Sequence, residues 1–171
     1  KNSFPTRRSS DLDTLTEGED IAFLGVPNFA PEILRRVKLG DPMKAKKLKE
    51  ALQQMAEEGV VQVFRPLDGA PALVGVVGPL QLDVLKVRLS EEYGLDIGFD
   101  QPEFQLARWI ASADEGKIDD FVQSNYSSCA EDLDGDKVFM ARNQFILDYT
   151  RERAPGISFT DIKDVKDKVV A

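Results

Sequence analysis

Histidine is absent from this 171-residue chain, and cysteine occurs once, at Cys129. These absences exclude a zinc cluster of His and Cys ligands, and they exclude Ser–His and Cys–His dyads as catalytic nucleophiles. A single cysteine cannot form an internal disulfide, which indicates a reducing compartment, and we expect the cytoplasm. No window approaches the run of about 18 apolar residues that spans a bilayer, so the sequence predicts no membrane partner.

The sequence also lacks a loop for nucleotide phosphates. Such a loop follows the pattern Gly-x4-Gly-Lys-Ser/Thr, because glycine amides wrap the phosphates while the lysine and the hydroxyl handle charge and Mg²⁺. The one Gly-Lys pair, Gly116-Lys117, is followed by Ile118 and has Ala111 where the first glycine should stand. We therefore expect no cofactor, no metal and no enzymatic activity in this chain.

Excess positive charge is lacking overall but present locally. The net charge is −8, from 30 acidic and 22 basic residues, which argues against a surface wrapped in nucleic acid and against a DNA partner. Residues 26–66 differ, because they hold eight basic and five acidic residues. This patch predicts an anionic partner, with RNA phosphate as the natural one, whereas the alternative is a solvated helix face. The candidate RNA-binding residues are Arg35, Arg36, Lys38, Lys44, Lys46, Lys47 and Lys49.

Three aspartates have the spacing of a calcium loop without its other ligands. Asp132, Asp134 and Asp136 occupy the first, third and fifth positions of such a loop. Lys137 replaces the glycine at the sixth position, and Asn143 replaces the bidentate glutamate at the twelfth. We expect a solvated hairpin tip here.

The two ends of the chain are expected to lie outside the fold. Residues 1–12 (KNSFPTRRSSDL) resemble translated sequencing-adapter read-through, so we expect a non-native tail there. Because the chain does not begin with Met, we expect a fragment or a processed product. Residues 13–26 have apolar content for one strand, and residues 164–171 alternate charge with valine and are expected to fray.

Residues 27–101 predict a β-α-β-β-α-β unit. Ile33, Val37 and Leu39 alternate with basic residues as in a half-buried strand, and later apolar residues recur at helical spacing between Pro and Gly stop signals. The expected elements are a strand at 32–39, a helix at 41–59, strands at 60–65 and 72–77, a helix at 78–94 and a strand at 95–100. This order is that of a ferredoxin-like fold.

Residues 102–163 predict the same order again. The expected elements are a strand at 103–110, a helix after Asp114-Glu115, strands at 128–130 and 137–140, a helix marked by Phe145, Ile146 and Tyr149, and a strand at 157–162. The hairpin signal at Asp134-Gly135 supports the pairing of the two middle strands. We expect an α+β protein of two ferredoxin-like units with antiparallel sheets, each covered by helices on one face.

Four segments together resemble the C-terminal domain of peptide chain release factor 3, the bacterial class II release factor. They are PNFAPEILRRVKL (27–39), EEGVVQVFRPL (57–67), GVVGPLQLDVLKVRLSEEYGL (75–95) and ARWI (107–110). Each segment alone is a weak signal, but the ordered set at this spacing is specific. The resemblance runs from about Asp13 to Lys163.

The resemblance implies a fold like domains III and V of elongation factor G, a related translational GTPase. It implies that residues 13–26 are a remnant of a preceding β-barrel domain and that GTP and Mg²⁺ belong to a missing N-terminal domain. The implied partners are the ribosome, through its RNA and proteins, and the GTPase and β-barrel domains of the full-length factor, which recycles class I release factors. The seven basic residues would then include the ribosome-facing charges.

Two other functions stay open from the sequence. One is a stand-alone RNA-binding or regulatory split β-α-β module. The other is a small enzyme that uses carboxylate pairs such as Asp119-Asp120 or Glu91-Glu92, which would need a pocket lined by converging acids.

Overall fold

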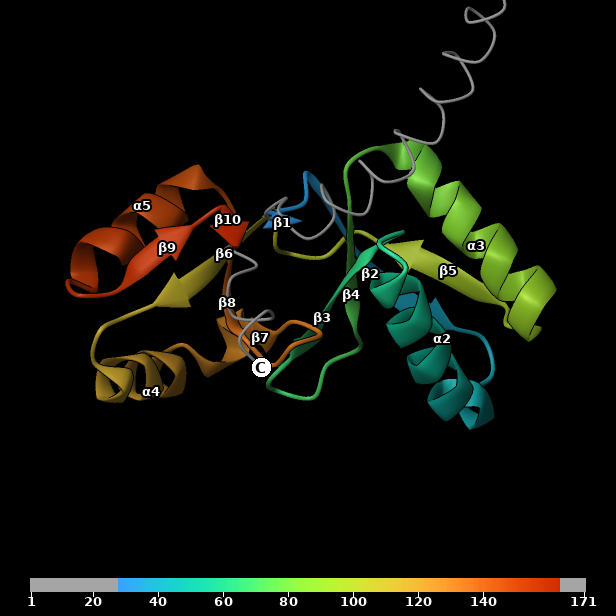
Figure 1. Ribbon diagram of the computed structural model, residues 1–171, viewed down its shortest axis with the longest axis horizontal. Helices are drawn as coiled ribbons and strands as arrows, with labels where there is room; N and C mark the ends of the chain where they lie inside the picture. Colours follow the sequence, from blue (N-terminus) through green and yellow to red (C-terminus); the bar gives the residue numbers. More distant parts are fainter. Residues whose placement is uncertain (1–27, 164–171) are drawn as a thin grey trace, which may run out of the picture. The chain divides into compact units, whose positions relative to one another are not determined.

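The computed structural model describes residues 28–163 (Figure 1). The expected tail at 1–12, the barrel remnant at 13–26 and the frayed end at 164–171 lie outside the described residues. The chain divides into two units. The described part of the first unit is an antiparallel pair of short strands, β1 (Asn28–Phe29) and β10 (Ile162–Lys163). The second unit, Ala30–Asp161, carries all the other elements.

The first half of the second unit has the predicted β-α-β-β-α-β order. Its elements are β2 (Ile33–Leu39), a 3-10 turn (Pro42–Lys44) that leads into α2 (Ala45–Glu57), β3 (Gln62–Pro66), β4 (Leu73–Val76), α3 (Pro79–Tyr93) and β5 (Ile97–Asp100). β2 and β4 are the central strands of this half, and β5 and β3 flank them, all antiparallel.

The second half repeats the arrangement. Its elements are β6 (Leu106–Ala111), α4 (Glu115–Ser124), a 3-10 turn (Tyr126–Ser128), β7 (Cys129–Glu131), β8 (Lys137–Ala141), α5 (Gln144–Arg153) and β9 (Ser158–Thr160). β6 and β8 are central, with β7 and β9 beside them. The strand expected at 157–162 is shorter than predicted, because the chain bends at Asp161 and Ile162 belongs to β10.

Strand pairing joins the two halves into one eight-stranded sheet. The outer strand β3 of the first half pairs with the outer strand β7 of the second, with Arg65 opposite Glu131 and Pro66 opposite Ala130. The strand orders β5-β2-β4-β3 and β7-β8-β6-β9 confirm the two predicted ferredoxin-like units. The β3–β7 pairing makes their sheets continuous. This junction also satisfies the backbone groups that a free strand edge would expose.

The helix boundaries follow the capping signals in the sequence. Asp41 precedes the first helical turn, and its side chain accepts a hydrogen bond from the Met43 amide at 3.0 Å, with Pro42 at the first position. Gly94 ends α3 with φ 64°, a left-handed conformation that favours glycine. The start of the first helical segment and the end of α3 therefore lie where local chemistry predicts them.

Alternating side chains along the strands separate three apolar cores. On β8, Val138 and Met140 belong to one core, whereas Phe139 and Ala141 belong to another. One outer core lies under α2 and α3 and includes Val37, Leu52, Met55, Val63, Leu85 and Leu89. The other lies under α4 and α5 and includes Ile110, Phe121, Cys129, Phe139, Leu147 and Phe159. A central core contains Leu34, Phe64 and Leu73 from the first half and Phe104, Ala107, Trp109, Ala130, Val138 and Met140 from the second.

Candidate anion-binding groove

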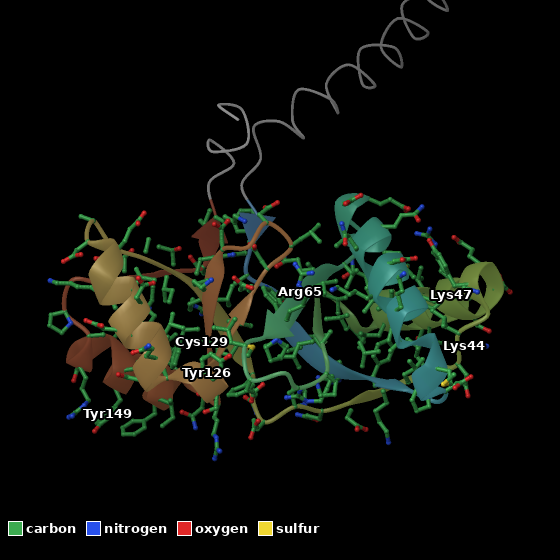
Figure 2. The ribbon with its side chains drawn as sticks, turned by 90° about the horizontal axis from the view of Figure 1, so that it is seen from below. Lys44, Lys47, Arg65, Tyr126, Cys129 and Tyr149 are labelled. Carbon is green, nitrogen blue, oxygen red and sulfur yellow. The ribbon has the colours of Figure 1, made fainter. Side chains whose placement is uncertain are left out.

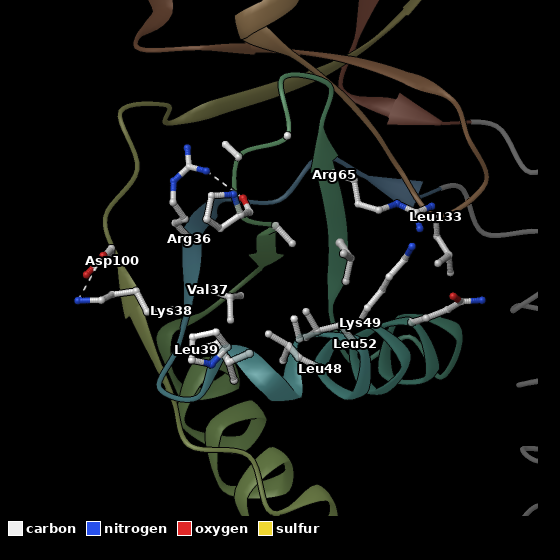
Figure 3. A pocket seen from close by; sticks show the side chains of 18 residues that line it. Arg36, Val37, Lys38, Leu39, Leu48, Lys49, Leu52, Arg65, Asp100 and Leu133 are labelled. Atoms are coloured by element: carbon white, nitrogen blue, oxygen red, sulfur yellow. Dashed lines mark hydrogen bonds and ion pairs between the residues drawn. The ribbon is translucent and has the colours of Figure 1, made fainter.

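A groove of about 850 Å³ opens between α2 and the sheet of the first half (Figure 3). It forms because β4 is shorter than its neighbours. The ladders of β4 end where Leu73 lies opposite Arg36 on β2 and Phe64 on β3. Beyond that point residues 67–72 connect β3 to β4, and residues of this connection line the groove together with residues of α2.

The floor of the groove is aliphatic. It is formed by Val37, Leu39, Leu48, Leu52, Val63 and Leu133, with alanines and prolines from the surrounding turns. Leu133 comes from the β7–β8 hairpin, so both halves of the unit contribute to the lining. The side chains that line the groove include no aromatic ring. A concave apolar surface of this size is typical of a binding site.

Cations surround this floor. Arg36, Lys38, Lys49 and Arg65 line the groove, together with a single carboxylate, Asp100. Two of the four are engaged within the protein. The Arg36 guanidinium donates a hydrogen bond to the Pro71 carbonyl at 2.9 Å, and the Lys38 ammonium lies 3.7 Å from the Asp100 carboxylate.

Lys49 and Arg65 differ, because neither has an ion-pair partner within residues 28–163. Figure 3 shows their side chains reaching toward the same side of the groove, near Leu133. Arg65 is half-buried and Lys49 is exposed. Two like charges beside an apolar surface, without a counter-ion in the described part, favour the approach of an anion.

The structure distributes the seven predicted basic residues over different surfaces. Arg36, Lys38 and Lys49 line the groove, whereas Lys44, Lys46 and Lys47 are exposed elsewhere on the helical segment (Figure 2). Arg35 is half-buried and donates a hydrogen bond to the Leu34 carbonyl at 2.8 Å. Which of these residues bind a partner stays a prediction.

Arg65 is the groove residue that sequence reasoning missed. Arg65 directly follows the apolar run VVQVF. A charged residue at the end of such a run indicates only that the strand leaves the core, so it does not point to a binding site. Its position beside Lys49 depends on α2 crossing the end of β3, which no local pattern in the sequence specifies.

The carboxylate pairs do not line the groove. Asp119, Asp120, Glu91 and Glu92 are all exposed. Hydrogen bonds from Arg88 to Glu92, at 2.8 and 3.2 Å, lower the pKa of that carboxyl, which is the opposite of what a general acid needs at neutral pH. The geometry gives these residues the role of solvated helix charges.

The three aspartates lie in the hairpin turn that the sequence predicts, but only Asp134 and Asp136 are solvated as expected, because Asp132 is buried. Asp132 Oδ1 accepts hydrogen bonds from the backbone amides of Asp134 and Asp136, both at 2.9 Å. Gly135 follows with φ 88°, which a tight turn of this kind requires. Asp132 is buried and serves the turn, while Asp134 and Asp136 are exposed.

Cys129 is a packing residue, because its side chain is 0% exposed in the core under α4 and α5. Burial raises the pKa of the thiol from 9.0 to about 12.

We expect a thiol reagent at pH 8 to label Cys129 of the folded chain at least a hundredfold (~10²) more slowly than Cys129 of the urea-unfolded chain. Between pH 9 and about 12 only the unfolded thiol loses its proton, so stability should fall as the pH rises. Equal labelling rates would contradict the burial.

Within residues 28–163, no helix has both the length and the apolar character needed to cross a bilayer. Residues 23–151 match the protein family described as class II release factor RF3, C-terminal domain. The matched segment includes α2, the groove, the β3–β7 junction and most of α5. Since it covers well over half of the 171 residues, the chain belongs to the C-terminal domain family of class II release factor RF3.

Proposed function

We propose that this chain docks a full-length release factor 3 on the ribosome, and that through this docking it supports the recycling of class I release factors during translation termination in the cytoplasm. The role is binding and not catalysis. In this proposal the GTPase domain of the full-length factor binds and hydrolyses GTP with Mg²⁺, because this sequence contains no phosphate loop. Membership of the release factor family supports the proposal.

The observation that carries the proposal is the exposed positive charge of α2 and its first turn. Lys44, Lys46 and Lys47 are exposed, and none has a carboxylate within 4.0 Å in the described part of the chain. The Lys44 ammonium donates a hydrogen bond to the Gly94 carbonyl at 3.2 Å. In a chain with a net charge of −8, such uncompensated lysines favour RNA phosphate as the partner.

Contacts between α2 and α3 hold this charged surface in place. The Arg88 guanidinium lies 3.0 Å from Glu58 just after α2 and 2.8 Å from Glu92 on its own helix. The Tyr93 hydroxyl lies 2.9 Å from the Gln54 side-chain oxygen, as a hydrogen-bond donor. Exposed pairs of this kind contribute little stability, but two of them link α3 to α2 and to the residue just after it. A fixed helix presents its lysines at a constant spacing to a phosphate backbone.

The proposal is tested by the salt dependence of ribosome binding. In the full-length factor, the variant Lys46→Gln/Lys47→Gln should reduce the slope of log K against log salt by about 1.4–1.8, because each phosphate contact contributes ~0.7–0.9. The matched control is Lys86→Gln/Lys117→Gln, which removes the same charge from exposed positions on α3 and α4. The control should leave the slope unchanged.

Equal slopes for the parent, the Lys46/Lys47 variant and the control would contradict RNA docking through α2. A reduced slope in both variants would show that net charge matters and its position does not, which would also overturn the proposal. GTP hydrolysis by the factor without ribosomes should be the same for all three proteins, since the lysines are not part of the GTPase domain.

A further inference from the structure

The RNA binding proposed above uses lysines outside the groove, so it gives no function to the aliphatic floor of the groove. Phosphate contacts need only charge, whereas this groove combines charge with a continuous aliphatic surface. Leu39, Leu48 and Leu133 are half-buried and supply the accessible leucines of this surface, whereas Leu52, Val37 and Val63 are only 2%, 4% and 8% exposed. A preformed apolar surface beside uncompensated cations is a feature of sites for amphipathic anions.

The sheet around the groove offers few free backbone groups. Val37–Leu39 on β2 pair with Ile97–Phe99 on β5, and the Val37 amide donates to the Ala72 carbonyl at 3.1 Å. On the other side, Arg65 and Pro66 of β3 pair with β7. The pairings with β5 and β7 occupy the edges of β2 and β3 that face away from β4, so an occupant cannot add a strand there, and the proposal concerns recognition through the side chains that line the groove.

The chemistry of the floor favours a peptide over RNA. Unpaired RNA bases are usually held by stacking on aromatic rings or guanidinium planes. The lining side chains include no aromatic ring, and of the two lining guanidinium groups Arg36 is engaged with Pro71 and lies 4.0 Å from Glu103, which leaves Arg65 as a single plane for stacking. Leucine, valine and alanine side chains instead match the aliphatic side chains of an amphipathic segment, which would bury apolar surface against them.

We propose that the groove binds an acidic amphipathic segment of a partner protein. The aliphatic side chains of the segment lie on the floor against Leu39, Leu48 and Leu133, which are half-buried. Its carboxylates lie on the side where Lys49 and Arg65 reach over the groove, because neither of those two cations has a carboxylate within 4.0 Å in residues 28–163. The side with Lys38 contributes less, since Asp100 already neutralises part of its charge.

The site is distinct from the phosphate-binding surface proposed above. Leu48, Lys49 and Leu52 of α2 line the groove, whereas Lys46 and Lys47 do not. One helix therefore presents two surfaces of different chemistry. Variants on one surface should leave binding at the other unchanged, and this separation makes the two proposals independently testable.

The probe is a synthetic helical peptide with leucines at positions i, i+4 and i+7 and glutamates beside them. Titrated into the isotope-labelled chain, it should shift the methyl signals of Leu48, Leu52, Val63 and Leu133. A peptide of the same composition in scrambled order should not shift them, because it cannot place its leucines on one face. A peptide with lysine in place of glutamate should not bind, because Lys49 and Arg65 repel it.

Charge reversal at the groove supplies the decisive variants. Lys49→Glu should weaken binding of the acidic peptide about tenfold, and adding Arg65→Glu should weaken it further. Because Lys49 is exposed, the single variant is expected to fold normally, which the unchanged amide spectrum checks. The matched control is Lys46→Glu/Lys47→Glu, which makes the same charge change outside the groove and should keep the affinity of the parent chain.

Three results would overturn the proposal. The first is the absence of shifts at the groove methyl groups with the acidic peptide. The second is equal binding of the acidic and scrambled peptides. The third is displacement of the acidic peptide by a single-stranded RNA oligonucleotide that shifts the same methyl groups, which would assign the groove to RNA. The ribosome salt slope of the Lys46/Lys47 variant is unaffected by any of these outcomes.

Discussion

A Phe64→Ala chain is expected to unfold with a free energy about 3–5 kcal/mol lower than that of the parent chain. Phe64 is 1% exposed and lies in the central core, which holds side chains from both ferredoxin-like halves. Its ring closely approaches Gly75, where a Cβ atom would lie 3.1 Å from Phe64 Cε2 and 2.5 Å from Pro31 Cγ. Removing the ring leaves a cavity that such tightly packed neighbours cannot easily fill.

Urea denaturation followed by circular dichroism measures this loss, with an unchanged m-value if the native state keeps its compactness. The matched control is Phe145→Ala, because Phe145 is 71% exposed on α5. The control should change the free energy of unfolding by less than ~0.5 kcal/mol. A Phe64 variant that behaves like the Phe145 variant would mean that the central core does not hold the two halves together.

Local elements are the part of the fold that the sequence predicts well. Alternation of Ile33, Val37 and Leu39 with basic residues places β2, and the signals at Asp41 and Gly94 place helix ends. These features depend on backbone capping and on side-chain periodicity, which act over a few residues. The repeated β-α-β-β-α-β order follows from them, and the family match agrees with the resemblance seen in four sequence segments.

The β3–β7 junction could not be predicted in the same way. Each half has a complete ferredoxin-like order by itself, so nothing in the periodicity requires the two sheets to join. Arg65 and Glu131 meet across sixty-five intervening residues. The burial of Trp109 and Phe104 could not be predicted either. They lie in the central core, on the face of the sheet that is buried only when the two halves are assembled.

In α5, two of the apolar residues that predict the helix are not the ones that are buried against the sheet. Phe145 and Tyr149 help to predict the helix, and the structure confirms it as Gln144–Arg153. The buried residue is Leu147, while Phe145 and Tyr149 are 71% and 50% exposed and stack with ring centroids 6.3 Å apart. Spacing four residues apart puts the two rings on one face, but only the packed sheet decides which face is covered.

Asp132→Ala is expected to cost about 1–3 kcal/mol of unfolding free energy, because it leaves a buried donor without its acceptor. The Trp109 indole N–H donates to Asp132 Oδ2 at 3.0 Å, and the two residues are only 7% and 8% exposed. The other carboxylate oxygen accepts from the amides of Asp134 and Asp136, so the same side chain also fixes the hairpin turn. Solvent can reach the exposed turn far more easily than it can reach the indole.

A double-mutant cycle separates these two roles of Asp132. In a Trp109→Phe background the indole donor is gone, so Asp132→Ala should cost at least ~1 kcal/mol less than it does in the parent chain. The remaining cost then belongs to the turn. Equal costs in the two backgrounds would show that the bond between Trp109 and Asp132 contributes nothing to stability. In that case the whole cost of Asp132→Ala would belong to the two hydrogen bonds from the amides of Asp134 and Asp136 that fix the hairpin turn.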